Sequence, residues 1–575
     1  MTSNGHIPNH PWHQRRIRRR QLLGAAAAAG VGAAGLALVG CGDDDDPADP
    51  APAVREEPAE QQAPAVDQAL TVAISAFPIG IDKDLSAGNF PTYESISQCY
   101  DTPIAFQTID YPFDDEFGQG AGYIDLGELE PWQLEAWELT DDASAIIMNI
   151  RPGVRSANGN ELTSADVAYT IDRAIALEAI GYFYNTLIDL DLENPYEIMD
   201  DYTIKVHATK ANGLLFSIWN DLFMPFIDAE TAQAAATSDD PWSIEFLASN
   251  CAGFGAYDVE SWTPGQEVVW AANPNYFQGP PAINRVIYRV IPDSSVRLSA
   301  LQAGEVDIAE DLSPDQWFEA RDTDGVKAFA VRSNFVYFAY MNSLLPPYDD
   351  IRVRQAFNIM MPRDQIAESV YLGLALPWRA ALSTINPGAN PDLWPFSEQP
   401  DAAAAKALLE DAGFGGGMEV ELSYTTALPL NEQVANLVRA SLAEIDVSVT
   451  LNPLPDGDMV DGTYGRTIPF GLWLDTPIGP DPIYGVFLYN YDPATISNHG
   501  QLDDPELQRL IDEAIPLTDL DDRVAASQAA QARALELSGF APLVEPFYTI
   551  AMRENVDGFT WHNANDMYFR QLRKS

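Results

Sequence analysis

The stretch that decides the fold lies between residues 134 and 173 and comprises LEAWELTDD at 134–142, IRPGV at 150–154, NG at 158–159 and LTSADVAYTIDR at 162–173. Its last segment predicts a helix, because Thr163 or Ser164 can cap the N-terminus and Asp166 falls in the first turn, near the positive end of the helix dipole. Residues 145–150 are apolar and predict a strand that ends at Arg151-Pro152-Gly153. The stretch therefore indicates a strand, a tight turn and a capped helix.

Strand and helix patterns alternate along the rest of the chain. Of its 575 residues, about 507 follow residue 68, and a single hydrophobic core stops growing at roughly 250–300 residues, so we expect two or more lobes of the α/β class. Gly304 and Gly413 are expected at helix ends that need a positive φ. The predicted strands are 70–76, 145–150, 202–207, 267–271 and 286–291, and the predicted helices are 164–171, 295–303, 351–361, 401–412, 431–444 and 505–515.

Further short segments follow in a fixed order. They are GFGAY at 253–257, NPNYF at 273–277, ALQAGEVDI at 300–308, Asn342, DIRVRQA at 350–356, Arg363-Asp364, Gly373, AKALLEDAG at 405–413, WLD at 473–475 and Asp481-Pro482. Together with residues 134–173, this ordered set resembles the family-five extracellular solute-binding proteins of bacterial ABC importers, the peptide- and nickel-type substrate-binding lipoproteins, over residues 70–575. The chain departs from the family pattern at the turn of residues 252–257 and in residues 106–130, which are longer and more acidic.

The resemblance implies an α/β, two-lobed fold like that of periplasmic binding proteins (large type II, cluster C), with an extra subdomain and a hinge between the lobes. A solute then binds in the cleft and must favour the closed state over the open one, since a ligand with equal affinity for both states does not shift the equilibrium between them. On this basis we expect lobe I to comprise residues 69–104, 254–339 and 541–575, a subdomain of lobe I to comprise residues 105–253, and lobe II to comprise residues 340–540.

The candidate ligand-binding residues follow an apolar run near the C-terminal third of the chain. Trp473 and Asp475 come directly before a Pro/Gly-rich loop that cannot continue the sheet, and the resemblance places the cleft near this loop. Asp475 can neutralise the α-amino group of a peptide, and Trp473 can pack against the ligand. The alternative is that Asp475 caps a turn and Trp473 fills the core. Asp481 has a second interpretation as a helix N-cap, and Tyr489 and Asn490 are further candidates downstream.

Sequence motifs give catalysis little support. No Gly-x-Ser-x-Gly elbow, His-Glu-x-x-His pair or phosphate loop occurs, and His207, His499 and His562 do not have the spacing of a metal site. We therefore expect a binding protein without catalytic residues, metal or cofactor, which takes a small solute and hands it to ABC permease subunits. Peptides are the favoured solute, because their backbone groups can pair with strands whatever the side chains. Nickel chelates or oligosaccharides are alternatives within the family, and a secreted hydrolase of peptides or glycans is the alternative outside it.

The first 68 residues have the composition of a leader and a tether. An arginine cluster at 15–20 precedes an Ala/Gly-rich run and the sequence LVGC, and this order is typical of a twin-arginine-like signal (residues 1–41) that ends at a lipid-acceptor cysteine, Cys41. Residues 42–68 are acidic and rich in Pro and Ala, so they indicate a flexible tether. The alternative is an uncleaved anchor helix. Both interpretations place the body outside the cytoplasm, in the periplasm or at the cell surface, and the first attaches it to the membrane through lipid alone.

Charge and cysteine content narrow the interpretation further. The formal net charge is −53, which repels nucleic acid and anionic lipid, so neither is expected as a partner. If Cys41 carries a lipid, Cys99 and Cys251 remain as an even pair in an oxidising compartment, where they either form a disulfide or stay as two buried thiols. After the leader, no apolar run reaches the ~18 residues that cross a membrane, so we expect a soluble body. We also expect the body to be a monomer.

Overall fold

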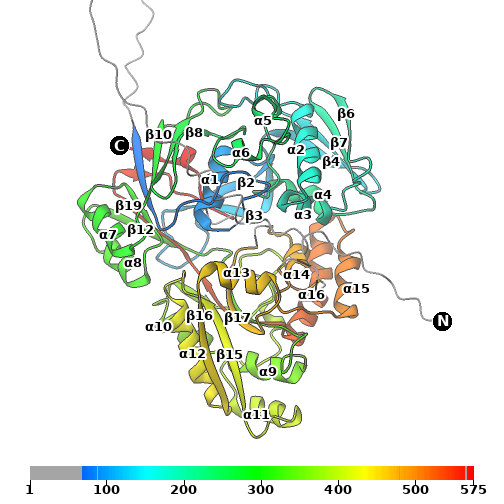
Figure 1. Cartoon of the computed structure of the whole chain (residues 1–575), viewed down its shortest axis with the longest axis vertical. Coiled ribbons are helices and arrows are strands. Elements are labelled where there is room, and N and C mark those ends of the chain that lie inside the picture. The colour runs from blue at the N-terminus through cyan, green and yellow to red at the C-terminus, as the bar shows by residue number, and fades with distance from the viewer. Residues whose placement is uncertain are drawn as a thin grey trace, which may run out of the picture. The chain divides into compact units, whose positions relative to one another are not determined.

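The structure is a computed structural model that describes residues 68–86, 88–477, 479–491, 493, 495, 497–563 and 566–575. The chain divides into two units, residues 1–64 and 65–575, and all the elements below belong to the second unit. The expected signal at 1–41, the lipid site at Cys41 and the expected tether up to residue 67 lie outside the described residues. Figure 1 shows the elements of the described part.

A seven-stranded mixed sheet forms the first lobe. Its middle strand, β1, runs parallel to β10 on one side and to β11 on the other. The strand order is β12 (Val326–Val331), β19 (Tyr548–Arg553), β11 (Ile308–Glu310), β1 (Ala69–Ile74), β10 (Arg285–Val290), β9 (Glu267–Ala272) and β8 (Tyr257–Thr263). This lobe also contains α1 (Phe90–Cys99), α7 (Ser294–Ala303), α8 (Pro314–Arg321), η5 (Phe569–Gln571) and the short strands β20 (Val556–Asp557), β21 (Trp561–His562), β22 (Asp566–Met567) and β23 (Arg573–Lys574).

A four-stranded antiparallel sheet forms a subdomain with its own helices. Its longest helix, α2, begins at the expected N-cap: the Asp166 carboxylate accepts hydrogen bonds from the Thr163 backbone N–H (2.8 Å) and hydroxyl (3.0 Å). The sheet has the order β4 (Leu134–Leu139), β5 (Ala145–Ile150), β7 (Thr203–His207) and β6 (Tyr196–Asp200). The other elements are the paired strands β2 (Ile104–Asp110) and β3 (Gly122–Pro131), and α2 (Ser164–Leu177), α3 (Ile180–Leu187), α4 (Leu214–Ser217), η3 (Ile218–Asn220), α5 (Ala229–Ala235) and α6 (Ile244–Leu247).

A six-stranded sheet forms the second lobe. Helix α12 packs against β15 and β16, and α14, α15 and α16 pack together, as Figure 1 shows. The strand order is β14 (Ala375–Pro377), β18 (Phe540–Pro546), β13 (Val336–Met341), β17 (Phe470–Asp475), β15 (Met418–Thr425) and β16 (Val447–Leu454). The helices are α9 (Ile351–Ile359), α10 (Arg363–Ser369), η4 (Pro391–Leu393), α11 (Ala402–Asp411), α12 (Asn431–Ala443), α13 (Asp456–Tyr464), α14 (Pro482–Asn490), α15 (Pro505–Ala514) and α16 (Leu520–Leu537).

The chain passes between the two lobes at two places. Residues 332–335 join β12 to β13, and Phe547 joins β18 to β19. The two connections lie side by side, because the Ser333 hydroxyl donates a hydrogen bond to the Pro546 carbonyl oxygen at 2.8 Å. They form the hinge, and the expected α/β, two-lobed fold is confirmed. The expected lobe boundaries at 339/340 and 540/541 fall inside β13 and β18, two strands of the second sheet.

The predicted strands and helices each have a counterpart in the structure. The predicted helix at 431–444 is α12, for example, and the predicted strand at 145–150 is β5. Gly304 (φ 75°) and Gly413 (φ 92°) follow α7 and α11, as expected for helix ends. Local signals in the sequence therefore place these elements correctly.

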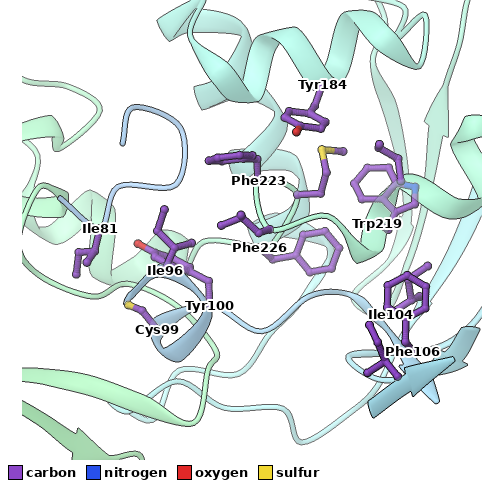
Figure 2. Close-up of a cluster of buried hydrophobic side chains, with 14 of the residues drawn as sticks. Ile81, Ile96, Cys99, Tyr100, Ile104, Phe106, Tyr184, Trp219, Phe223 and Phe226 are labelled. Atoms are coloured by element: carbon purple, nitrogen blue, oxygen red, sulfur yellow. The ribbon is translucent and has the colours of Figure 1, made fainter. Parts of the chain in front are cut away.

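One large hydrophobic cluster contains side chains from both lobes. Its members include Ile96 and Phe223 from the first lobe and its subdomain, and Tyr484 and Tyr489 from the second lobe. Part of this cluster is shown in Figure 2, where Tyr184 and Phe223 lie close together. The lobes are therefore in direct contact in this structure.

Candidate ligand-binding site

Trp473 and Asp475 lie at the end of β17, where the strand passes into the Pro/Gly-rich loop. Asp475 is partly exposed, and its Oδ1 accepts a hydrogen bond from the Thr476 N–H at 2.8 Å. Burial raises the pKa of Asp475 to about 6, although the Thr476 N–H and the Tyr489 and Trp473 side chains favour the charged form. No arginine or lysine of the described residues lowers this pKa. Asp475 is therefore a partly desolvated carboxyl on which no described arginine or lysine acts.

Aromatic side chains surround the Asp475 carboxyl. The Trp473 ring lies 5.0 Å from the His499 ring and 5.9 Å from the Tyr464 ring, measured between centroids. Tyr464 is 42% exposed, yet the protein atoms that crowd its ring, and then the charge of Asp475, raise its pKa, so the Tyr464 hydroxyl lies within electrostatic reach of the carboxyl. Burial and the positive charge of Arg466 lower the pKa of His499 to about 3, which leaves this histidine neutral at physiological pH. These rings form an apolar wall beside a single acid.

Asp481 lies at the N-terminus of α14, as the N-cap interpretation predicts. Its Oδ1 accepts hydrogen bonds from the N–H groups of Ile483 at 2.8 Å and Tyr484 at 3.1 Å. Its Oδ2 pairs with the Arg523 guanidinium at 2.6 Å, and both partners are buried. Both carboxylate oxygens are thus occupied by contacts within the protein.

Tyr489 and Asn490 lie at the other end of α14. Burial and the Asp475 charge raise the pKa of Tyr489 well above its usual value, so Tyr489 and Asp475 share one environment. Asn490 is fully buried and donates a hydrogen bond to the Val486 carbonyl oxygen of its own helix at 3.1 Å. The structure therefore brings Tyr489 together with Trp473 and Asp475, whereas Asp481 and Asn490 hold the helix.

A second carboxyl, which the sequence analysis did not select, belongs to the subdomain. Asp221 is fully buried in the loop after η3, and its Oδ1 accepts a hydrogen bond from the Phe223 N–H at 2.9 Å. Burial raises its pKa to about 7, and the Phe223 N–H and the Tyr184 hydroxyl oppose this shift. The one available signal was an isolated acid inside the apolar run LLFSIWNDLFMPF at 214–226. A lone charge in such a run is unusual because burial of an unpaired charge is costly.

The two carboxyls act on shared tyrosines between the lobes. The hydroxyls of Tyr184 on α3 and Tyr484 on α14 lie 3.3 Å apart, although 300 residues separate them in the sequence. Burial, and then the charges of Asp475 and Asp221, raise the pKa of Tyr93 and of Tyr484. One carboxyl from each lobe therefore faces a common group of aromatic residues, and this region is the candidate site.

A small cavity adjoins the loop that follows Asp475. Its volume is about 10 Å³, which is about enough for one water molecule and too little for a peptide. Asn334 connects the hinge to the loop after β17, because its Nδ2 donates a hydrogen bond to the Pro477 carbonyl oxygen at 2.9 Å. The cavity is lined by Leu126, Asn334, Ser383, Ile385, Asn386, Pro477, Pro480 and Asn563.

Cys99 and Cys251, which the sequence leaves as either a pair or two thiols, form a disulfide with their Cα atoms 5.8 Å apart. In the described part of the chain, no three His, Cys, Asp or Glu side chains gather in a way that could hold a metal ion. None of the described helices combines the length and apolar character needed to cross a membrane.

Two lobes are joined by a hinge, and carboxyls with few hydrogen-bond partners lie among aromatic residues where the lobes meet. This architecture is typical of proteins that hold a solute between two lobes. The sequence profile of "Bacterial extracellular solute-binding proteins, family 5 Middle" matches residues 128–495, which is more than half of the chain. The chain belongs to this family of bacterial extracellular solute-binding proteins, family 5.

Individual relatives agree with this assignment. The chain is 24% identical to Heme-binding protein A of Haemophilus influenzae over 440 residues, which cover 70% of this chain and 76% of the relative. It is 24% identical to Di/tripeptide-binding protein 2 of Pseudomonas aeruginosa over 453 residues, which cover 75% of this chain and 83% of the relative. The fold is also similar to the solved structure of the periplasmic binding protein DppA from Helicobacter pylori in complex with the peptide STSA, with a TM-score of 0.75. The two sequences are 19% identical, and the match covers 88% of this chain and 98% of that chain.

Family membership confirms several expectations from the sequence. The resemblance to family-five solute-binding proteins is correct, and the fold is that of their two-lobed relatives. The family consists of binding proteins, so the chain is a solute-binding protein and not an enzyme, which removes the hydrolase alternative. The family's extracellular character agrees with the expected location outside the cytoplasm.

Proposed function

We propose that this protein is the receptor of an ABC importer, which binds peptides between its lobes and delivers them to the permease subunits. The observation that carries the proposal is Asp475, a desolvated carboxyl beside Trp473 that no described arginine or lysine balances. A carboxylate in a low-dielectric cleft is stable only with a cation or several hydrogen-bond donors. The α-amino group of a peptide supplies a positive charge and up to three donors.

The surroundings of Asp475 suit the rest of a peptide. Trp473 and Tyr464 present aromatic faces on which apolar side chains can pack. Relatives support the same solute class, because one of them is named for binding di- and tripeptides and a solved structure with this fold holds the peptide STSA. Peptide binding irrespective of sequence follows if backbone groups and waters make most of the contacts.

The test compares a free amine with a blocked one. Calorimetry should show that wild-type protein binds Ala-Ala about 10- to 100-fold more tightly than N-acetyl-Ala-Ala, since a hydrogen bond to a charged group contributes about 1.5–3 kcal/mol. Asp475→Asn should lose this difference. Asp458→Asn, an exposed acid on α13 of the same lobe, is the matched control and should retain it. An equal loss for both peptides in Asp475→Asn would assign Asp475 a structural role, and turnover of peptide by the wild type would contradict a receptor.

We also propose that the body is attached to the outer face of the cytoplasmic membrane through lipid on Cys41. The support is the LVGC sequence after an arginine-rich, apolar leader. Cys41→Ala should move the protein from the membrane to the soluble fraction, whereas Gly42→Ala, which keeps the cysteine, should leave it on the membrane. An unchanged membrane fraction in Cys41→Ala would contradict lipid attachment.

A further inference from the structure

Asp221 is a fully buried carboxyl whose surroundings do not satisfy it. Its Oδ1 accepts a hydrogen bond from the Phe223 N–H at 2.9 Å, and the Tyr184 hydroxyl also favours the charged form, but its Oδ2 accepts no hydrogen bond from the described residues. No arginine or lysine of the described chain acts on the carboxyl. Buried polar groups are nearly always satisfied in native proteins, so each exception calls for an explanation such as a ligand.

Two other buried carboxyls, Asp84 and Asp166, have both oxygens satisfied. Asp84 pairs with the Arg173 guanidinium at 2.5 Å and with the Lys83 ammonium at 2.7 Å. Asp166 has no cation, but both of its oxygens accept hydrogen bonds: Oδ2 from Thr163 and Oδ1 from the Ala229 N–H at 2.9 Å. Glu310 also leaves Oε1 without a hydrogen bond, but the charge of Arg297 acts on it. Asp221 has an oxygen without a hydrogen bond and no cation of the described residues acts on it, so structural burial alone does not account for it.

The position of Asp221 connects it to the candidate site. The Phe223 ring lies 5.5 Å from Tyr184 and 5.9 Å from Tyr93, and Tyr184 meets Tyr484 of the second lobe. Figure 2 shows Tyr184 and Phe223 as neighbours in this aromatic group. The charges of Asp221 and Asp475, which belong to opposite lobes, both raise the pKa values of Tyr93 and Tyr484. A solute between the lobes therefore has an acid on each side.

We propose that Asp221 is a second cation-binding position of the site, and that the solute is a peptide with both a free α-amino group and a basic side chain. This inference rests on the proposed function and deepens it: Asp475 takes the amino group, and Asp221 takes the ammonium or guanidinium of a lysine or arginine side chain. Long basic side chains can carry their charge between aromatic rings, whose faces attract cations. The net charge of −53 also raises the local concentration of cationic solutes around the protein.

The experiment measures dissociation constants for matched pairs of dipeptides by calorimetry. Lys-Ala is compared with norleucine-Ala, and Ala-Lys with Ala-norleucine, because norleucine has a similar unbranched stem without the charge. Wild-type protein should bind the basic member of at least one pair about tenfold or more tightly, as expected for a charge-assisted hydrogen bond in a desolvated site. Asp221→Asn should bind both members equally, whereas Asp475→Asn should weaken both members and keep their ratio. Thermal melting confirms that each variant is folded.

The outcomes separate this inference from the proposed function. If the wild type binds neutral and basic members of both pairs equally, the second cation-binding position is wrong while peptide binding stands. This comparison needs no variant, so it decides the question even if Asp221→Asn does not fold. A preference that persists in Asp221→Asn also overturns the assignment to Asp221. If no dipeptide binds, the proposed function fails and the inference fails with it.

Discussion

Gly213→Ala should weaken solute binding without any contact to the solute. Gly213 precedes α4 in the subdomain, and its N–H donates a hydrogen bond to the Ile515 carbonyl oxygen of the second lobe at 2.8 Å. A Cβ at this position would overlap the Leu517 carbonyl oxygen and the Arg523 guanidinium. The backbone angles of Gly213, φ −68° and ψ −22°, are favourable for alanine. The substitution therefore opposes this contact between lobes while leaving each lobe unstrained.

The magnitude follows from the two interactions that are lost. Forcing an extra carbon into a packed contact costs about 1–3 kcal/mol, and loss of the backbone hydrogen bond adds about 1 kcal/mol. The closing equilibrium should shift by about 2–4 kcal/mol, so the dissociation constant for a bound dipeptide should rise by about 30- to 1,000-fold. Calorimetry gives the affinity, and small-angle scattering gives the compaction at saturating peptide.

The matched control is Gly416→Ala, since a Cβ at Gly416 of the second lobe meets no atom within 4 Å and its φ is not positive. This variant should bind peptide like the wild type. If Gly213→Ala binds peptide as tightly as wild type, the contact between Gly213 and the second lobe is not part of closure. If its melting temperature falls while its affinity is unchanged, the contact exists in the open and the closed states, and the reasoning is also refuted.

Two further predictions concern the buried charges of the first lobe. Burial and the nearby charge of Glu94 raise the pKa of Glu310 well above its usual value, so the stability that its protonated form provides is lost as the pH rises. Glu310→Gln should therefore gain stability relative to wild type between pH 5 and 8, by about 1–3 kcal/mol at the upper end. A pH-independent difference between the two proteins in denaturant titrations would contradict this. Arg173→Met should lower the free energy of unfolding by about 3–5 kcal/mol, because Arg173 pairs with both Asp82 and Asp84 at 2.5 Å in the interior. The control is Arg509→Met. The ion pairs of Arg509 are exposed, so this substitution should lower the free energy of unfolding by less than about 1 kcal/mol.

The fold was accessible from the sequence because its signals are local. Thr163 and Asp481 precede helices and cap them through contacts within a few residues. Apolar runs such as residues 145–150 form strands for the same reason, since side-chain patterning fixes the element before tertiary contacts are known. Trp473 and Asp475 were selected as candidates because a Pro/Gly-rich loop follows their strand and the family resemblance places the cleft near this loop.

The other half of the candidate site depends on contacts that no local pattern records. Tyr184 and Tyr484 meet across 300 residues of sequence. Asp221 belongs to the site only because the subdomain places it near the same tyrosines as Asp475. In sequence, Asp221 differs from the many other acids of the chain only by its apolar neighbours. Its lack of a partner becomes visible once the surrounding elements are in place.

The two carboxyls give a physical reason why the empty protein should resist closure and the loaded protein should close. With the lobes in contact, Asp475 and Asp221 are desolvated without a cation, and their pKa values are raised to about 6 and about 7. A cationic solute offsets that cost in the closed state alone, which is the differential affinity that closure requires. We expect separation of the lobes to hydrate both carboxyls and to lower these pKa values. The closed state then binds more protons than the open state, so lowering the pH from 8 to 5 should compact the empty protein. The Asp221→Asn, Asp475→Asn double variant should be compact at both pH values, and a pH response that survives in it would show that the closing equilibrium is controlled by other groups.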